Sequence, residues 1–403
     1  IGTQGIPANY GGLETFAEEI STRLAARGHS VYVTCERTSD EREGPSEYQG
    51  VNLLSVSTPD SNLRTIVGDL KALWRCYREA EPGDIVYLLG YGAGPFAWPL
   101  LKALQVKGVR FWLNPDGLEW KRPRWPKWVR GYLRFSEWFF LREADTIICD
   151  AKAIKTHHQQ TWNVDPDRME VIEYGAPVVE KDTFSAEVLQ HRDEYLAQYD
   201  LEPGDYYTYV GRFVPDNNLE LIVRGILDER IKRRLLIFAE HDDKDPFYQK
   251  LLDLVQGSDH PEKVIFTGGV YDQPLLQALR LGEYAYLHGH EVGGTNPALV
   301  EAMGLGSLVL ALNTSFNREV LSKAGLFFGK SVESFVQTVR HAERLSVEEI
   351  RRYRRRAVDR VRMRYNWERV TDKYEERIGD PSAPRGGPSV PVAPESETMS
   401  SSG

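Results

Sequence analysis

The sequence predicts an α/β protein made of two doubly wound domains with parallel sheets, and three observations support this. The chain has 403 residues, more than the size at which one hydrophobic core keeps growing. Short apolar runs typical of buried strands alternate with amphipathic helical patterns in both halves. Glycines and polar residues follow these runs, at the places where parallel strands end and ligands bind.

The first half begins with a loop, a helix and a strand. Residues 2–7 have the composition of a loop that follows a strand, and only Ile1 precedes this loop in the sequence. We therefore expect most of a first, central strand to be missing. Apolar residues at helical spacing predict a helix from 11 to 27, with Gly28 as its stop. The strands expected after it are residues 30–34, 84–89, 110–113, 146–150 and 170–175.

The second half repeats this pattern after a charged connection over residues 178–204. Its expected strands are residues 207–210, 235–238, 264–266, 285–287 and 308–311. Because ligands bind beyond the carboxyl ends of such strands, the cleft between two facing sheets is the expected site.

The end of the chain divides into two parts. Residues 347–378 predict a charged amphipathic helical region, in which the basic run 351–356 is a solvated helix face rather than a nucleic-acid arm. Proline, serine, glycine and glutamate dominate beyond Asp380, which predicts a disordered tail. We expect an amino-terminal domain over 1–178, a carboxyl-terminal domain over 179–355, a helix over 356–379 that returns to the first domain, and a tail over 380–403.

The composition excludes several classes of protein. A net charge of −9 argues against a protein whose whole surface binds nucleic acid. The three cysteines, Cys35, Cys76 and Cys149, are far apart and lack metal-site spacing, which indicates a reducing cytoplasm. No run of eighteen apolar residues occurs, so a membrane role would be peripheral.

Residues 288–304 form the most informative segment, a glycine-rich turn that leads into a helix carrying Glu301 one turn in. Glycines let a backbone approach phosphate, a helix start favours an anion, and a carboxylate can accept hydrogen bonds from a ribose diol. The alternative is a strand end followed by a well-capped helix. Arg212 follows the first strand of this half, where its planar fork can bind a diphosphate or form an ordinary salt bridge.

The chain resembles glycosyltransferase family 4, which has the GT-B fold of two Rossmann-like domains facing a central cleft. More closely, it resembles the rhamnosyltransferase-like subgroup that carries the domain of unknown function 1972. The resemblance runs from Ile1 to about Ile378, and its most specific blocks are residues 2–16, 114–122, 211–213 and 293–297.

The resemblance implies transfer of a sugar from a nucleotide-diphosphate donor, with retention of configuration and without a metal or other cofactor. It implies that Gly11 and Gly12 approach the donor phosphate, that Arg212 neutralises the diphosphate and that Glu301 holds the ribose. Asp116 stands where many relatives have histidine, and it can orient the acceptor hydroxyl, favour oxocarbenium charge or simply cap a turn. Glu119 is the second candidate carboxylate.

The chain departs from the family pattern at two places. The usual glutamate eight residues before Glu301 is Gly293 here, and the usual lysine after the Gly-Arg pair is replaced by asparagines. The candidates to replace the missing carboxylate are His290, Glu291, Thr295 and Asn296, and Gly294 is expected to bind the donor in the same turn.

Other interpretations remain open at this stage. Two carboxylates beside a cleft also describe a glycosidase, although that enzyme needs no diphosphate site. His288 and His290 can ligate a metal, but no third ligand is spaced to join them, so packing is the better interpretation. The donor sugar can be rhamnose, mannose or glucose, and the chain can instead be a non-catalytic sugar-nucleotide binding subunit.

Residues 120–140 interleave basic and aromatic side chains. This mixture suits a helix in the headgroup layer of an anionic membrane, and it also suits an interdomain or dimer surface. We expect a cytoplasmic enzyme, peripheral at the inner face of the membrane, with a saccharide or lipid-linked saccharide acceptor and no nucleic-acid partner.

Overall fold

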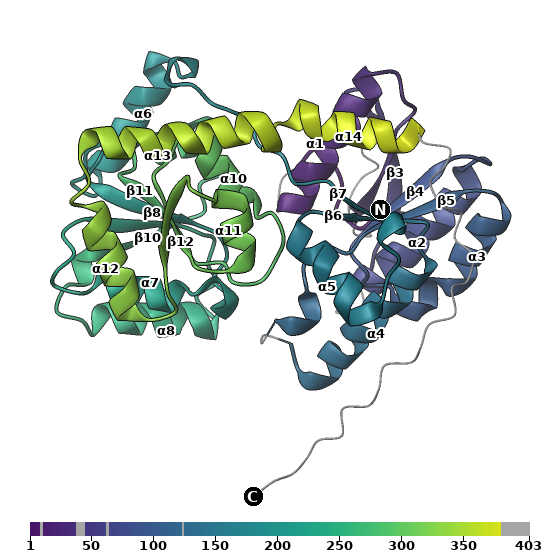
Figure 1. Cartoon of the computed structure of the whole chain (residues 1–403), viewed down its shortest axis with the longest axis horizontal. Helices are drawn as coiled ribbons and strands as arrows, with labels where there is room; N and C mark the ends of the chain where they lie inside the picture. Colours follow the sequence, from purple (N-terminus) through teal and green to yellow (C-terminus); the bar gives the residue numbers. More distant parts are fainter. Residues whose placement is uncertain (9–10, 38–44, 62–63, 123–124, 380–403) are drawn as a thin grey trace, which may run out of the picture. The chain divides into compact units, whose positions relative to one another are not determined.

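A computed structural model of the chain describes residues 1–8, 11–37, 45–61, 64–122 and 125–379. They form two compact units (Figure 1). Unit 1 comprises residues 1–116 and 131–172 together with the chain end from residue 376. Unit 2 comprises residues 117–130 and 173–375. The expected tail beyond 379 lies outside the described residues.

Unit 1 contains two sheets. A three-stranded sheet has the order β1-β3-β2, and a four-stranded sheet has the order β4-β5-β6-β7. All neighbours are parallel except β2 and β3. The strands are β1 (Tyr32–Arg37), β2 (Glu47–Tyr48), β3 (Val51–Ser57), β4 (Ile85–Leu89), β5 (Arg110–Asn114), β6 (Thr146–Cys149) and β7 (Met169–Val171).

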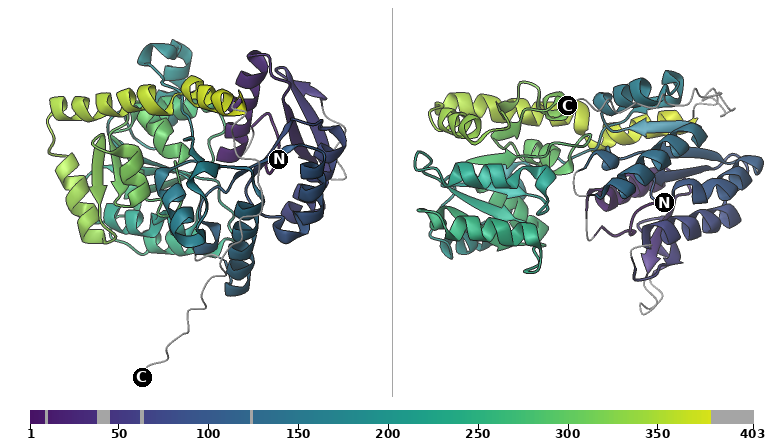
Figure 2. Two further views of the ribbon diagram at one scale, coloured as in Figure 1. Left: turned by 45° about the vertical axis from the view of Figure 1, so that its right-hand side comes forward. Right: turned by 90° about the horizontal axis from the view of Figure 1, so that it is seen from below.

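Residues 1–4 connect the two sheets of unit 1. The Leu89 N–H donates to the Ile1 carbonyl oxygen, and the Glu36 N–H donates to the Gln4 carbonyl oxygen, each at 2.9 Å. The N-terminal helix α1 is drawn in purple in both views of Figure 2. The helices of this part of the chain are α1 (Gly12–Ala26), α2 (Arg64–Glu79), α3 (Trp98–Val106), α4 (Lys127–Glu143) and α5 (Lys152–Trp162).

Unit 2 contains one six-stranded parallel sheet with the order β10-β9-β8-β11-β12-β13. Its strands are β8 (Tyr206–Val210), β9 (Arg234–Phe238), β10 (Val264–Gly268), β11 (Ala285–His288), β12 (Val309–Leu312) and β13 (Gly325–Phe328). Its helices are α6 (Ala186–Ala197), α7 (Leu219–Ile226), α8 (Pro246–Gln256), α9 (Gln273–Gly282), α10 (Pro297–Gly304), α11 (Ser315–Leu321), α12 (Val332–Ala342) and α13 (Val347–Arg360). The last helix, α14 (Trp367–Gly379), begins in unit 2 and ends in unit 1.

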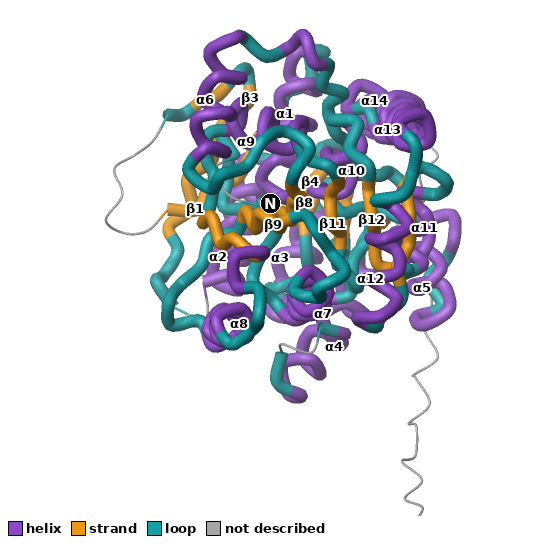
Figure 3. The backbone as a smooth tube through the Cα atoms, turned by 90° about the vertical axis from the view of Figure 1, so that its left-hand side faces the viewer, coloured by secondary structure: helices purple, strands orange, loops and turns teal. Residues whose placement is uncertain are grey.

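Both faces of the unit 2 sheet are covered by helices. Tyr207 and Tyr209 of β8 pack in a core with α7, α8 and α12, whereas Tyr206 packs in a second core with α6 and α9. This alternation follows from the two-residue period of a strand. Figure 3 shows the strands in orange with purple helices around them. The unit is therefore the doubly wound arrangement that the alternating pattern predicts.

The predictions from sequence locate most strands of both units but miss three strands and one helix. Strands β3 and β13 were not expected, and neither was the hairpin strand β2. The expected connection over 178–204 contains the helix α6, whose Leu196 is fully buried. The helical region expected over 347–378 is two α-helices, because a π-helical turn at Val361–Tyr365 separates them.

Candidate functional site

The carboxyl ends of β8 and β11 meet at one edge of the unit 2 sheet, since these strands are parallel neighbours. The loop 211–218 follows β8, and the turn 289–296 follows β11 and leads into α10. Asn218 Nδ2 donates to the Gly289 carbonyl oxygen at 3.0 Å, and the Glu291 N–H donates to the Asp216 carbonyl oxygen at 3.2 Å. This edge therefore brings together the two segments that the sequence analysis assigns to donor binding.

The glycines at this edge differ in how much room they leave for a side chain. A Cβ on Gly289 would collide with the carbonyl oxygen of Asn217, and a Cβ on Gly211 would lie 2.7 Å from the Tyr209 hydroxyl. Both glycines are thus required for loop packing. A Cβ on Gly293 would meet nothing within 4 Å, so the turn is open on that side, whereas a Cβ on Gly117 would lie 3.3 Å from the Gly293 Cα.

Two stacked imidazoles form part of this edge. The His288 and His290 ring centroids lie 4.5 Å apart with their planes 13° apart. Burial, together with the positive charges of Arg122 and Arg212, lowers the pKa of His290 to about 3. Burial also holds the pKa of His288 well below its ordinary value. Both rings are therefore neutral near pH 7 and can offer hydrogen bonds but no charge.

Arg212 is held by its backbone and exposed at its side chain. Its carbonyl oxygen accepts hydrogen bonds from the Tyr209 hydroxyl at 3.2 Å and from Asn217 Nδ2 at 3.0 Å. No described residue forms an ion pair with its guanidinium, so the ordinary salt bridge weighed from the sequence is absent from the described part of the chain. The residue thus combines a fixed backbone with a cation that carries no internal counter-ion.

Glu291 is held by groups from two other elements. Lys330 Nζ, just after β13, donates to both carboxylate oxygens at 2.8 and 2.7 Å, and Asn218 Nδ2 lies 3.4 Å from one of them. The Glu291 side chain is 36% exposed. Lys330 was not among the predicted site residues, although its position shortly after a strand of the same sheet is a signal that could have found it.

Glu301 is paired with an arginine that the sequence analysis did not consider. Arg280 of α9 is 3% exposed; its guanidinium lies 3.2 Å from the Glu301 carboxylate and donates to the Ala298 carbonyl oxygen at 2.8 Å. Desolvation raises the pKa of Glu301, which the nearby Arg280 charge opposes. The Glu301 side chain still keeps 35% of its surface exposed, so a ligand can reach it.

The start of α10 offers an unused acceptor. Thr295 is buried, and Asn296 occupies the N-cap position without a side-chain capping bond. The Oδ1 atom of Asn296 is buried and has no hydrogen-bond partner among the described residues. A buried acceptor without a partner is costly, so a ligand hydroxyl or amide at this point would be stabilised. Gly294 lies in the same turn, and the helix dipole here favours an anion.

Residues 117–130 belong to unit 2 and bring Glu119 to this unit. Arg122 lies 2.6 Å from the Glu119 carboxylate and 3.5 Å from the buried carboxylate of Asp216. Glu119 also accepts a hydrogen bond from Trp125 Nε1 at 3.2 Å. Its carboxylate is therefore engaged inside the unit, which disfavours the role of a free catalytic base.

The remaining candidates, Gly11, Gly12 and Asp116, lie in unit 1. Gly11 has φ +89° at the N-cap of α1, and Gly12 begins that helix. Asp116 follows β5 with φ +56°, and its N–H donates to Asn114 Oδ1 at 2.8 Å. The Asn114 side chain thus caps this turn through the Asp116 N–H.

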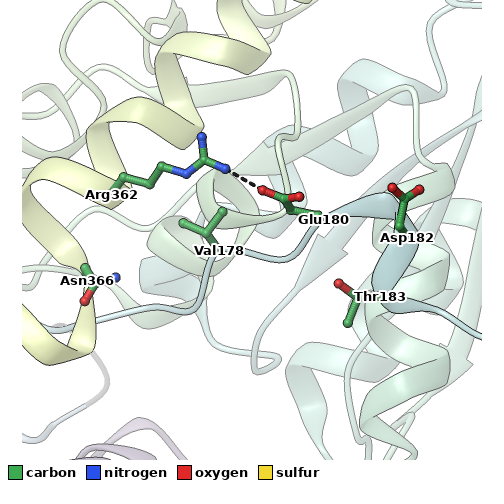
Figure 4. A pocket seen from close by; sticks show the side chains of 6 residues that line it. All are labelled: Val178, Glu180, Asp182, Thr183, Arg362 and Asn366. Carbon is green, nitrogen blue, oxygen red and sulfur yellow. Dashed lines mark hydrogen bonds and ion pairs between the residues drawn. The ribbon is translucent and has the colours of Figure 1, made fainter.

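A hollow of about 480 Å³ lies elsewhere in unit 2 (Figure 4). Its lining residues are Val178, Glu180, Asp182, Thr183, Arg362 and Asn366. Arg362 and Glu180 form an ion pair of 2.7 Å across it, as the dashed line in Figure 4 marks. Because these two charges neutralise each other, and because none of the predicted site residues lines this hollow, we do not assign the donor to it.

Comparison with known proteins supports the fold prediction. Residues 1–177 match a family described as "Domain of unknown function (DUF1972)". Comparison with curated proteins gave no match in sequence.

Three solved structures are similar over almost their whole length. Sucrose-phosphate synthase from Thermosynechococcus elongatus has a TM-score of 0.74 at 17% identity, covering 91% of this chain and 92% of that one. A glycosyltransferase from Rickettsia africae has a TM-score of 0.70 at 14% identity, covering 93% and 96%. Anabaena Alr3699/HepE, solved in complex with UDP, has a TM-score of 0.69 at 12% identity, covering 92% and 97%.

At these identities the likeness concerns the fold. The expectation of parallel-sheet Rossmann-like units is confirmed by the sheets of both units and by these neighbours. The chain therefore has the GT-B fold of glycosyltransferases, and its first 177 residues match the domain of unknown function DUF1972.

Proposed function

We propose that this protein is a retaining glycosyltransferase that moves a sugar from a nucleotide-diphosphate donor to a saccharide acceptor. The observation that carries the proposal is Arg212, an exposed cation without an internal counter-ion, beside an open turn at the start of a helix. Such a pairing suits a diphosphate, which requires both fixed positive charge and free backbone donors. Retention of configuration rests on the sequence resemblance to family 4.

The nucleotide part of the donor is assigned to Glu301. Its partly exposed carboxylate can accept hydrogen bonds from both hydroxyls of a ribose, and the buried Arg280 orients it through an ion pair. The neutral stacked ring of His290 lines the same edge. A neutral ring adds no positive charge of its own, so the diphosphate is held by Arg212 and the helix start.

Departure of the leaving group is the step that these residues assist. The bond between the anomeric carbon and the phosphate oxygen breaks, and its electron pair passes to the diphosphate. The acceptor oxygen forms the new bond to the anomeric carbon, and its proton goes to the departing phosphate oxygen. Arg212 and the dipole of α10 stabilise the charge that grows on the diphosphate, so we propose that the reaction requires no metal.

The sugar itself is assigned to the turn before α10. Glu291, held by Lys330, supplies a carboxylate near the position where relatives carry glutamate. The unpartnered Oδ1 of Asn296 adds an acceptor for a sugar hydroxyl. Thr295 and Gly294 complete the turn. We propose rhamnose as the donor sugar, from the subgroup resemblance, with mannose or glucose as outcomes that a donor screen distinguishes.

The residues of unit 1 are assigned to the phosphate and the acceptor. Gly11 and Gly12 precede and begin α1, so their backbone N–H groups are free of intrahelical bonds and suit a phosphate. Asp116 is assigned to the acceptor hydroxyl from the resemblance to family 4, and it directly follows the carboxyl end of β5. Glu119 ranks below it because Arg122 and Trp125 already engage its carboxylate.

A screen of donors tests this function. Purified protein is mixed with UDP-, GDP- and dTDP-sugars, and thermal unfolding is followed. A bound donor at a hundred times its dissociation constant adds about 2.7 kcal/mol to the free energy of unfolding. The donor that binds is then incubated with and without acceptor, and products are identified. Transfer or slow donor hydrolysis supports the enzyme; binding without either supports a non-catalytic binding subunit and contradicts our proposal.

We further propose that the acceptor is lipid-linked, in bacterial surface polysaccharide synthesis, and that α4 touches an anionic membrane from the cytoplasmic side. Within the described residues, no helix has both the length and the apolar character needed to cross a bilayer. The helix α4 exposes Trp128 by 77% and Phe135, two turns later, by 48%, with Lys127 and Arg134 exposed beside them. Aromatic and basic side chains together suit the headgroup layer.

Not all of residues 120–140 belong to this surface. Arg122 is ion-paired inside unit 2, and Phe139 is buried, while Arg124 lies outside the described residues. Vesicle flotation tests the remaining face. Replacing Lys127 and Arg134 by glutamate should abolish preference for anionic vesicles, and the same change at the exposed Arg355 and Arg356 of α13 should not. Wild-type protein that shows no such preference would contradict the membrane proposal.

A further inference from the structure

Unit 1 contains a cluster of metal-ligating side chains away from the residues assigned to transfer. Glu137 lies in α4, and His157 and His158 are consecutive in α5. One ligand atom from each residue lies within 4.8 Å of those of the other two. Glu137 and His158 are both 0% exposed, and His157 is half-buried. We call Glu137, His157 and His158 the α4–α5 cluster.

We propose that the α4–α5 cluster binds one divalent transition-metal ion of the zinc class, with water as the fourth ligand. Two imidazoles and one carboxylate are a ligand set that suits zinc and disfavours magnesium or calcium, which prefer oxygen. Tetrahedral zinc with bonds of about 2.0 to 2.2 Å places ligand atoms roughly 3.4 Å apart. Rotations of these side chains that shorten the distances between the ligand atoms would let all three atoms coordinate one ion.

Two neighbouring side chains orient the cluster. Trp162 Nε1 donates to Glu137 Oε2 at 2.6 Å, and a carboxylate can accept such a bond on one oxygen while it ligates through the other. Thr161 Oγ1 lies 3.3 Å from Nδ1 and 3.4 Å from Nε2 of His157, within hydrogen-bond reach of either ring nitrogen. Hydrogen bonds to ligands are what fix ring orientation and ligand basicity in metal sites. Both supporting side chains come from the last turn of α5, the helix that also carries the two histidines.

Burial favours the ion over a purely structural role for these residues. Burying the Glu137 carboxylate away from water is costly, and a cation bound by Glu137 and both histidines would offset this cost. The ion would tie α4 to α5 and stabilise unit 1. The cluster contains none of the residues assigned to donor or acceptor, so this proposal is independent of metal-free transfer.

Metal titration of the full chain tests the proposal. Chelator-treated protein is titrated with Zn²⁺ by calorimetry and with Co²⁺ by visible absorption, because four-coordinate cobalt absorbs far more strongly than six-coordinate cobalt. We expect one Zn²⁺ per chain and a four-coordinate cobalt spectrum that Zn²⁺ abolishes. Thr161→Val, which removes only a supporting hydrogen bond, should weaken zinc binding roughly 10- to 100-fold.

Matched histidine variants complete the test. His157→Gln should weaken binding at least as much as Thr161→Val, and its half-buried position favours a folded protein. His191→Gln, at an exposed histidine of α6, should leave affinity and stoichiometry unchanged. Absence of stoichiometric zinc uptake by the wild type, a six-coordinate cobalt spectrum, or equal affinity of His157→Gln and His191→Gln would each overturn the site.

Discussion

Arg212 and Glu301 occupy the same edge of unit 2 but are held in opposite ways. The Arg212 backbone is fixed by Tyr209 and Asn217, while its charged group is exposed and has no ion-pair partner among the described residues. Glu301 instead has its charge fixed by the buried Arg280. Arg212, which we assign to the diphosphate, is therefore kept without a counter-ion. Glu301, which we assign to the ribose hydroxyls, is oriented by its counter-ion Arg280.

The largest expected effect comes from removing the unpaired cation. Arg212→Ala should lower transition-state stabilisation by about 2 to 4 kcal/mol, because the other cations near this edge, Lys330 and Arg122, already pair with Glu291 and Glu119. This is a loss of about 30- to 1,000-fold in kcat/KM, measured with the donor found in the screen. The control is Arg224→Ala, another exposed arginine of unit 2, which pairs with Glu220. If Arg212→Ala and Arg224→Ala have the same kcat/KM, the unpaired Arg212 is no more important for transfer than a paired surface arginine, which contradicts our proposal.

Removing the buried cation should act mainly on stability. Arg280→Leu deletes the hydrogen bonds to Glu301 and to the Ala298 carbonyl oxygen. The free energy of unfolding should fall by about 1.5 to 3 kcal/mol, measured by urea denaturation. Glu301→Gln alone and the double variant complete a thermodynamic cycle. Additive effects in that cycle would mean that Arg280 does not hold Glu301.

The neutral histidine at the edge predicts a pH dependence. The pKa of His290 falls from 6.5 to about 3 on folding, so below pH 6.5 the unfolded chain binds a proton that the native protein does not. The free energy of unfolding should therefore fall by about 1.4 kcal/mol per pH unit for this residue as the pH drops from 6.5. His290→Asn should remove that slope in denaturation experiments. An unchanged slope would show that His290 is protonated in the native state.

The smallest stability effect is expected at Lys330. Its ion pair with Glu291 is exposed, with 61% of the lysine side chain accessible, so Lys330→Ala should cost only about 0.2 to 1 kcal/mol. The Michaelis constant for the donor should nevertheless rise, as it should in Glu291→Gln. If Glu291→Gln has the same Michaelis constant for the donor as the wild type, the Glu291 carboxylate takes no part in sugar recognition.

The sequence could predict the edges of the sheets because that information is local. An apolar run followed by a glycine marks the end of a buried strand. The strand β8 ends at the predicted residue 210, and β11 ends at His288, one residue beyond its predicted end. The strand β3 was missed because Asn52 and Ser55 interrupt its apolar run. The helix α6 was missed because it buries little besides Leu196 and has a weakly patterned, charged sequence.

The partners of the site residues could not be predicted in the same way. Arg280 reaches Glu301 from a different helix, and Lys330 reaches Glu291 from the far edge of the sheet, so each pair depends on tertiary packing. Arg122 lies 94 positions before Asp216 in the chain. The α4–α5 cluster was missed for the same reason, since Glu137 comes from one helix and its histidines from the next. The roles of Arg212, Glu301 and Asp116 themselves stay predictions.

The central claim is that Arg212 binds the second phosphate of the donor nucleotide, and calorimetry with paired nucleotides tests it most directly. UDP and UMP, or the corresponding guanosine or thymidine pair, are titrated into wild-type protein and Arg212→Ala. We predict that the wild type binds the diphosphate more tightly than the monophosphate and that Arg212→Ala loses most of this preference. The same ratio of diphosphate to monophosphate affinity in both proteins would contradict the claim.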